Sequence, residues 1–391
     1  MSQPLGWISI ARLGLVQACL GAIVVLTTST LNRVMVVELA LPALLPGVLV
    51  ALHYLVQVAR PRMGHGSDVG GRRTPWIVGG IALLAVAGVL AAAATAWMAT
   101  RPLAGAALAV VAFALVGLGV SASGTSLLVL LAKRVAPERR APAATIVWMM
   151  MILGFAVTAG IAGRLLDPYS PARLVLVSGG VSAIAMVVTL LALAGLEGSG
   201  NGPDGLAEPQ TAKPRFREAL AQVWSEPAAR QFTIFVALSM LAYSAQDLIL
   251  EPFAGTVFGY TPGESTQLSG VQHGGVLAGM ILVALAGHGF RGRRFGSLRA
   301  WTVGGCIASA VCLFGLALSG LVGPAWPFRA TVFALGVANG AFSIAAIGSM
   351  MALAVGSGMG RGGREGTRMG LWGAAQAIGF AGGGLIGTAL S

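Results

Sequence analysis

Long apolar runs, repeated along the whole chain, constrain this sequence most strongly. A run of about 20 apolar residues is what an α-helix needs to cross the hydrocarbon core of a bilayer. Hydrophobic residues make up 56% of the chain and charged residues only 10%, whereas soluble domains carry roughly 25% charged residues. We therefore predict an all-α polytopic membrane protein. The predicted spans are residues 13–32, 43–60, 76–98, 104–131, 143–166, 172–196, 231–251, 266–288, 300–321, 328–355 and 369–390.

Basic residues are divided unevenly between alternate loops. Five of the 25 lysines and arginines fall in or near the loops of one parity, and the others fall in the loops of the opposite parity. Because cytoplasmic loops carry the excess of basic residues, we expect a cytoplasmic N-terminus. The net charge of +12 then reflects membrane topology and not nucleic-acid binding, since the basic residues form no continuous face with interleaved aromatics. The minority residues are Arg33, Arg101, Arg164, Arg173 and Arg329.

A glycine-rich stretch separates the first six predicted spans from the last five. Residues 198–205 have the composition of a flexible linker. We therefore predict an N-terminal six-helix half at 1–196, a cytoplasmic linker at 197–230 and a C-terminal half at 231–391. Within the linker, apolar residues at helical spacing predict either an interfacial helix or a solvated helix. These residues are Phe216, Leu220, Val223 and Trp224.

The two halves share a weak internal repeat. Span five contains Trp148 and the triplet Gly154–Ala156, and span eleven contains Trp372 and the triplet Gly379–Ala381 in the same order. Repeats of this kind are typical of secondary transporters. The alignment of the halves predicts a twelfth span after residue 391, so the visible chain reads as a two-half bundle that is one helix short.

The loop between spans two and three resembles the loop signature of the major facilitator superfamily. It reads Gly-His-Gly-Ser-Asp-Val-Gly-Gly-Arg-Arg from residue 64 to residue 73. Its glycines allow a tight turn, and its aspartate can pair with an arginine or a helix N-terminus at the inner gate of the bundle. The alternative is a basic loop that only obeys the positive-inside rule. The motif residues are Gly64, Asp68, Gly71, Arg72 and Arg73.

Charged groups near the outer ends of spans are fewer and therefore more informative. Arg33 follows span one, and Asp247 and Glu251 lie at the end of span seven, on one helix face because they are i and i+4. An ion pair from Arg33 to either carboxylate would close the outer side of the bundle. The alternative is that these side chains only snorkel to the headgroups. The predicted outer polar cluster consists of Asn32, Arg33, Glu38, Gln246, Asp247 and Glu251.

No enzyme signature is present in the sequence. It has no His-Glu-x-x-His metal motif, no phosphate-binding glycine loop and no serine elbow. Cys19, Cys306 and Cys312 lie within apolar runs, where cysteine behaves as a small hydrophobic residue. The predicted spans also place carboxylates away from the membrane midplane, which disfavours proton coupling. We expect no catalytic site and no bound metal ion.

Several blocks together resemble the BCH/PUCC family, a branch of the major facilitator superfamily. They cover nearly the whole chain, and the Asn-Arg-x-Met and Gln-Asp-x-x-x-Glu-Pro blocks are the most specific. The blocks are Leu31–Leu39 with Pro42, Gly64–Asp68, Ala245–Phe253, Leu268–His273 and Gly370–Gln376. The fold that this resemblance implies is a major-facilitator-like two-half bundle.

The resemblance also implies a function, namely the assembly of light-harvesting antennae in the photosynthetic inner membrane. The implied partners are membrane lipid, light-harvesting antenna polypeptides, and bacteriochlorophyll or its synthesis machinery. Because a neutral imidazole can ligate the magnesium of a chlorin, the candidate pigment-binding residues are His53, His273 and Gln376. A histidine bonded to a neighbouring helix is the simpler alternative. An ordinary transporter of a small solute or tetrapyrrole remains the second functional hypothesis.

Overall fold

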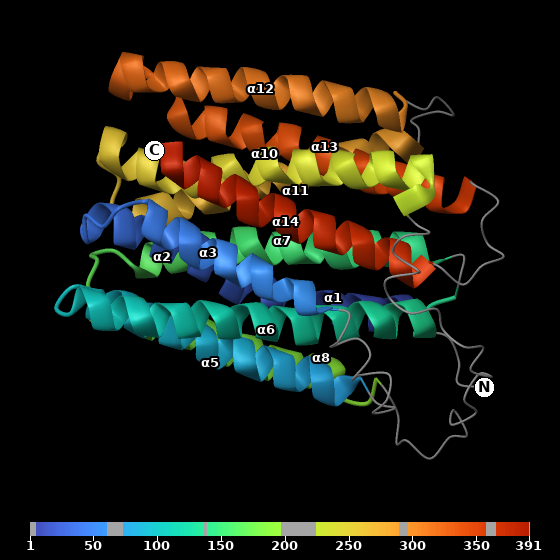
Figure 1. Ribbon diagram of the computed structural model, residues 1–391, viewed down its shortest axis with the longest axis horizontal. Coiled ribbons are helices and arrows are strands. Elements are labelled where there is room, and N and C mark those ends of the chain that lie inside the picture. The colour runs from blue at the N-terminus through green and yellow to red at the C-terminus, as the bar shows by residue number, and fades with distance from the viewer. Residues whose placement is uncertain are drawn as a thin grey trace.

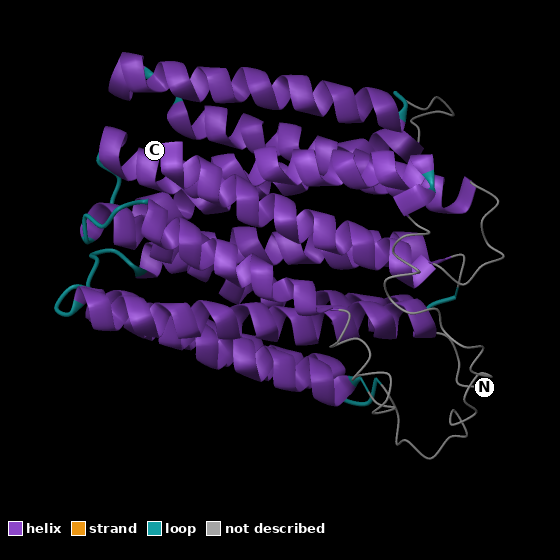
Figure 2. Ribbon diagram, in the orientation of Figure 1, coloured by secondary structure: helices purple, strands orange, loops and turns teal. Residues whose placement is uncertain are grey.

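A computed structural model describes residues 5–60, 73–136, 139–196, 224–288, 296–356 and 365–390. The regular structure in these ranges is helical, as Figure 2 shows. Long helices lie alongside one another in one bundle (Figure 1). Nine helices in this part of the chain are long and apolar enough to cross a membrane, which confirms the predicted fold class.

The helices have bounds close to those of the predicted spans. Proline occupies the first turn of several of them, where its missing N–H has no partner to lose. Those of the first six spans are α1 (Trp7–Val25), η1 (Leu26–Thr30), α2 (Leu31–Arg33), η2 (Val34–Glu38), α3 (Leu44–Val56), η3 (Gln57–Ala59), α5 (Thr74–Met98), α6 (Pro102–Arg134), α7 (Arg140–Leu165) and α8 (Pro171–Leu193). The others are α10 (Pro227–Phe258), α11 (Pro262–His288), α12 (Leu298–Val322), η5 (Gly323–Ala325), α13 (Phe328–Gly356) and α14 (Glu365–Leu390).

The first membrane helix is longer than predicted. It runs from Trp7 to Glu38 through α1, η1, α2 and η2 without a break, whereas the sequence predicts an end at residue 32. The segments η1 and η2 are π-helical, and turns of this kind are frequent at functional sites. Near the start of η1, the hydroxyls of Thr27 and Thr28 both donate to the carbonyl of Val24, at 2.8 and 2.9 Å. Arg33 therefore lies inside the span and not after it.

Two groups of helices make up the bundle. In the first group, α1 packs on α7 and α8, α5 packs on α6 and α8, and α3 packs on α6. In the second group, α10 packs on α14, and α13 packs on both α11 and α12. The groups meet along two helix pairs, α7 with α11 and α3 with α14. In the arrangement of Figure 1 the second group lies above the first.

Close packing within the second group depends on glycine. Gly279 of α11 and Gly340 of α13 face the neighbouring backbone so closely that a Cβ on either would collide with a main-chain carbonyl, that of Val337 or Val276 respectively. Small residues four apart allow helices to approach in this way. Gly275 and Gly279 of α11 and Gly336 and Gly340 of α13 thus form a close seam between the two helices.

The two ends of the bundle differ in their basic residues. At one end lie the loops from η2 to α3, α5 to α6, α7 to α8, α10 to α11 and α12 to α13, seen at the left of Figure 1. The five basic residues of the minority set lie in or near these loops. We name this side of the molecule the arginine-poor end.

Candidate functional site

Asp247 and Glu251 lie deeper in the bundle than the sequence predicts. Helix α10 continues past them to Phe258 and contains Pro252 in its interior. Asp247 is eleven residues from that end, or about 16 Å at 1.5 Å per residue. The expectation that carboxylates avoid the membrane interior is therefore wrong, because the apolar run resumes after the Glu251–Pro252 step and the helix continues with it.

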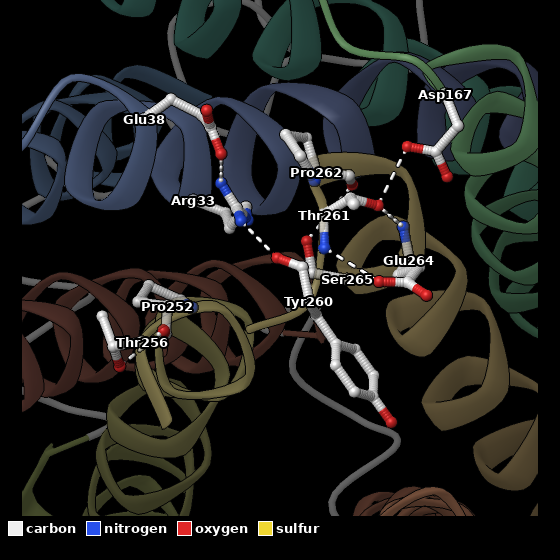
Figure 3. Close-up of polar contacts among 10 residues, drawn as sticks. All are labelled: Arg33, Glu38, Asp167, Pro252, Thr256, Tyr260, Thr261, Pro262, Glu264 and Ser265. Carbon is white, nitrogen blue, oxygen red and sulfur yellow. Dashed lines mark hydrogen bonds and ion pairs between the residues drawn. The ribbon is translucent and has the colours of Figure 1, made fainter. Parts of the chain in front are cut away.

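Arg33 forms the most completely buried charged contact at the arginine-poor end. Its side chain is 2% exposed and donates to Glu38 Oε1 at 2.5 Å and to the carbonyl of Tyr260 (Figure 3). The ion pair expected from Arg33 to Asp247 or Glu251 is not formed; its acidic partner is Glu38. The π-helical turn explains the difference. Its backbone hydrogen bonds join residues five apart, so side chains at i and i+5, such as Arg33 and Glu38, lie near one face.

Asn32 resolves a defect that Pro252 creates. Proline has no N–H, so the carbonyl of Leu248, four residues earlier, loses its partner within α10. The side chain of Asn32 donates to that carbonyl at 2.8 Å and is 1% exposed. Two residues before Asn32, the hydroxyls of Thr30 and Thr266 hydrogen-bond at 3.1 Å and tie the same segment to α11. The Asn-Arg block and the Glu-Pro block of the sequence are thus complementary parts of one contact.

A second set of polar contacts joins α10 to α11. Gln272 Nε2 donates to Asp247 Oδ1 at 3.1 Å. The neighbouring His273 has its Nδ1 at 2.8 Å from the carbonyl of Ser269 and interacts electrostatically with Asp247. Phe155 of α7 meets the imidazole of His273 edge-on, with ring centroids 4.9 Å apart.

Glu251 has the least compensated charge of the site. It is 2% exposed, and neither carboxylate oxygen has a hydrogen-bond partner of good geometry in the described chain. The guanidinium of Arg33 and the hydroxyls of Ser29 and Ser269 are near enough to act on its charge. Burying such a group without a bonded partner is costly, and ionisable residues at this depth are by default functional candidates. We name the set Asn32, Arg33, Glu38, Asp247, Glu251, Gln272 and His273 the polar junction.

The polar junction continues into the loops at the arginine-poor end. Thr261 donates through its hydroxyl to Asp167 Oδ1 at 2.9 Å, which joins the loop after α10 to the loop after α7 (Figure 3). The backbone N–H of Thr261 donates to Glu264 at 2.9 Å. In the same region burial, and secondarily the charge of Glu38, raise the pKa of Tyr169 above its ordinary value. This end is therefore closed by bonds between the two groups of helices.

Both candidate pigment-binding histidines are buried and in contact with neighbouring side chains. His53 is 1% exposed, its Nε2 lies 2.9 Å from the side-chain amide of Gln57, and the ring of Tyr54 lies against it at 4.8 Å. His273 is 5% exposed and is covered by Phe155. A macrocycle bound at either ring would need space that these contacts fill. Gln376 is half-buried, and its side-chain nitrogen lies 3.9 Å from the sulfur of Met240.

Other predicted site residues are in different surroundings. Gly64, Asp68, Gly71 and Arg72 lie outside the described residues, as does most of the predicted linker, whereas Arg73 directly precedes α5. Gln246 has a buried Nε2 without a hydrogen-bond partner in the described chain. Among the residues that the structure describes, no group of three or more histidine, cysteine, aspartate or glutamate side chains could hold a metal ion.

Sequence reasoning missed several members of the site. Gln272 and Ser269 contribute bonds that their block Leu268–His273 alone does not predict, and the carbonyls of Leu248 and Tyr260 carry no side-chain signal. A stack of Tyr54 on Phe380, centroids 4.8 Å apart, also joins α3 to α14. Pro252 was the available signal, because a proline inside an apolar helix always leaves a carbonyl to be satisfied.

Comparison with solved structures places the fold among transporters. A peptide transporter POT in complex with sulfate superposes with a TM-score of 0.69 at 13% identity, over 100% of this chain and 91% of the other. A nucleoside transporter, NupG, superposes with a TM-score of 0.65 at 14% identity, over 98% and 89% of the two chains. At such low identity the likeness concerns the fold alone, which is the predicted major-facilitator-like two-half bundle.

Sequence relatives cover most of the chain. It is 55% identical over 389 residues to a protein of Rhodobacter capsulatus named "Bacteriochlorophyll synthase 44.5 kDa chain", covering 99% of this chain and 88% of that one. It is 31% identical to "Protein PucC" of the same species, over 94% of this chain and 80% of the relative. The family model described as "PUCC protein" matches residues 30–391. This chain therefore belongs to the PUCC family, as its Asn-Arg and Gln-Asp-x-x-x-Glu-Pro blocks predict.

Proposed function

We propose that this protein takes part in assembling photosynthetic antenna complexes, where it handles bacteriochlorophyll or delivers it to antenna polypeptides. The observation that carries the proposal is the 55% identity, along 88% of its length, to a relative named for bacteriochlorophyll synthesis, supported by the PucC relatives. The proposed location is the bacterial inner, intracytoplasmic photosynthetic membrane, with a cytoplasmic N-terminus as the loop charges predict.

The lining of the bundle interior is compatible with a flat apolar ligand. Tyr54 stacks on Phe380, and Tyr243 meets Phe380 edge-on with centroids 6.0 Å apart. Each of these tyrosines keeps part of its surface open although it lies deep between helices. Aromatic faces stack with flat rings, and the nearby Met240 can adapt its shape. A tetrapyrrole would meet these rings if the two groups of helices separated, without ligation by His53 or His273.

We infer a non-enzymatic role, although one relative is named as a synthase chain. The carboxylates that a catalytic reading would use belong to the polar junction. Asp247 already accepts a hydrogen bond from Gln272, and Arg33 is bonded to Glu38 and Tyr260. Their bonds join helices to one another, which supports a structural and conformational role rather than proton transfer to a substrate.

Deletion and complementation in a phototrophic bacterium test the proposal. Deletion should reduce the near-infrared absorption of antenna complexes while pigment synthesis continues. Complementation with Asp247→Ala should lower antenna absorption more than it lowers the amount of this protein in the membrane. Arg101→Ala, at an exposed residue between α5 and α6, is the control outside the polar junction. Normal antenna levels after deletion would refute the proposal, and a parallel fall of both quantities would make the junction merely structural.

A second candidate is secondary transport of a small solute or a tetrapyrrole. The specific observation in its favour is the depth of Asp247 and Glu251 in α10, because carriers use buried polar groups of this kind near the midplane. Reconstituted protein would then take up its solute in response to a pH gradient. The transporter hypothesis requires uptake that Asp247→Asn abolishes, whereas the assembly hypothesis requires none.

A further inference from the structure

A hollow of about 340 Å³ opens at the arginine-poor end, beside the loops that follow α10 and α12. It is separate from the polar junction, and Tyr260 links the two, since it lines the hollow and its carbonyl accepts a hydrogen bond from Arg33. Most of its wall is aromatic or proline, and it contains one charged side chain. The lining residues that matter here are Phe258, Tyr260, Trp326, Phe328 and Arg329.

The aromatic wall is rigidly packed. Phe258 and Phe328 are stacked, with centroids 4.4 Å apart and planes at 25°. Tyr260 meets Phe328 nearly at right angles, with centroids 5.9 Å apart. Stacked and edge-on pairs of this kind are favourable arrangements. The apolar surface therefore exists before anything binds to it.

Two polar groups of the hollow are available to a ligand. Arg329 is exposed and its guanidinium lies 5.6 Å from the centre of the Tyr260 ring. Arg329 forms no ion pair with an acidic residue of the described chain, where the paired charges are Arg33 and Glu38. The Tyr260 side chain points away from Arg33, and its hydroxyl makes no contact with the other residues drawn in Figure 3. The indole of Trp326, by contrast, donates to Thr331 at 2.9 Å.

We propose that this hollow binds the headgroup of an anionic phospholipid. Its phosphate would accept hydrogen bonds from Arg329 and from the Tyr260 hydroxyl, and its glycerol region would lie on the aromatic wall. Arginine suits phosphate because its planar fork can donate two bonds at once. Trp326 and Tyr260 lie at the ends of membrane helices, where tryptophan and tyrosine are enriched at the membrane–water interface.

The apolar surroundings favour a lipid over a soluble anion. Leu321 and Val322, at the end of α12 next to the hollow, are 85% and 53% exposed. Acyl chains can lie on them while the phosphate stays at Arg329. A free phosphate ion would use the guanidinium but would gain nothing from these side chains.

Occupancy of the hollow also acts on the polar junction. The ring of Tyr260 forms part of the hollow, and its carbonyl accepts a hydrogen bond from Arg33. A headgroup that holds the ring therefore holds the loop in which Arg33 finds its acceptor. Lipid binding should stabilise the closed arrangement of the arginine-poor end. This inference does not rest on the proposed function in antenna assembly.

The test uses the full chain purified in detergent and stripped of lipid. Phosphatidylglycerol is titrated against it while thermal stability is recorded and bound lipids are counted by native mass spectrometry. Wild type should gain stability and retain one lipid that Arg329→Ala lacks. The apparent affinity of the variant should fall about tenfold, the loss expected for one charge-assisted bond. Arg329→Lys should recover part of it, and Arg101→Ala, an exposed arginine at the same end, should behave as wild type.

Three results would overturn the proposal. Equal stabilisation of wild type and Arg329→Ala would show that the hollow is not the site. Equal stabilisation by phosphatidylcholine would show that no anion is recognised. Displacement of the lipid by millimolar inorganic phosphate, with the same stabilisation, would assign the site to a soluble ion.

Discussion

The hydrogen bond from Asn32 to the carbonyl of Leu248 can be tested against its cause, which is Pro252. In Asn32→Leu the side chain keeps its shape but loses the donor, and the carbonyl is left buried beside a proline. An unsatisfied buried carbonyl costs about 1–3 kcal/mol in soluble proteins. Hydrogen bonds between membrane helices average about 0.6 kcal/mol. We therefore expect Asn32→Leu to lower the free energy of unfolding by about 1 kcal/mol.

Replacing Pro252 supplies the missing donor from within the helix. In Pro252→Ala the new N–H can bond the carbonyl of Leu248, since it stands four residues later. In that background Asn32→Leu should cost less than about 0.5 kcal/mol, so the two substitutions should be coupled. The assay is reversible unfolding in mixed micelles with a rising fraction of denaturing detergent, followed by tryptophan fluorescence.

The control for this cycle is a polar residue of the same helix. Gln246 has a buried Nε2 without a hydrogen-bond partner in the described chain, so Gln246→Leu should show no coupling to Pro252→Ala. An equal cost of Asn32→Leu in both backgrounds would refute the reasoning, because Asn32 would then not be compensating for the proline.

Three further predictions follow from burial and packing. Arg33→Ala should destabilise the protein more than Glu38→Ala, because Arg33 is 2% exposed and also bonds Tyr260, while Glu38 is 31% exposed. Thermal unfolding of both variants measures the order, and a larger loss of stability in Glu38→Ala would contradict it. Gly340→Ala should lower the free energy of unfolding by more than about 2 kcal/mol, because a Cβ there collides with the carbonyl of Val276. Gly274→Ala, whose Cβ would meet nothing within 4 Å, should be neutral or slightly stabilising. Similar unfolding midpoints for both variants would be incompatible with the described seam. His53→Gln should leave antenna absorption at wild-type level when protein abundance is matched, because contacts with Gln57 and Tyr54 close off the imidazole; loss of pigment at unchanged abundance would show that the ring opens to a chlorin.

The fold class and the spans could be predicted from sequence because both depend on local properties. Hydropathy over about 20 residues decides whether a segment can cross a membrane, and no knowledge of its neighbours is needed. Family membership was likewise readable from the Asn-Arg and Gln-Asp-x-x-x-Glu-Pro blocks.

Span ends were predicted less well where a charge or a proline interrupts an apolar run. Arg33 and Glu251 each suggested an end, yet both helices continue, to Glu38 and Phe258. A charge inside a span is tolerated only where the fold supplies partners, and those partners come from distant parts of the chain. Of the residues that the sequence singled out, Arg33 and Glu38 contact each other, and Asn32 contacts the backbone of the helix that carries Asp247 and Glu251.

The choice of partner within that junction was decided by tertiary structure alone. The predicted positions of Arg33, Asp247 and Glu251 at the outer ends of spans suggested an ion pair between them. The π-helical turn instead brings Glu38 to Arg33, and the backbone carbonyl of Tyr260 completes the contact. Hydrogen bonds act over about 3 Å, so a change of a fraction of a turn exchanges one partner for another. Residue types along the chain determine that a membrane bundle forms and which polar groups it must bury, and only the packing of its helices determines which of those groups touch.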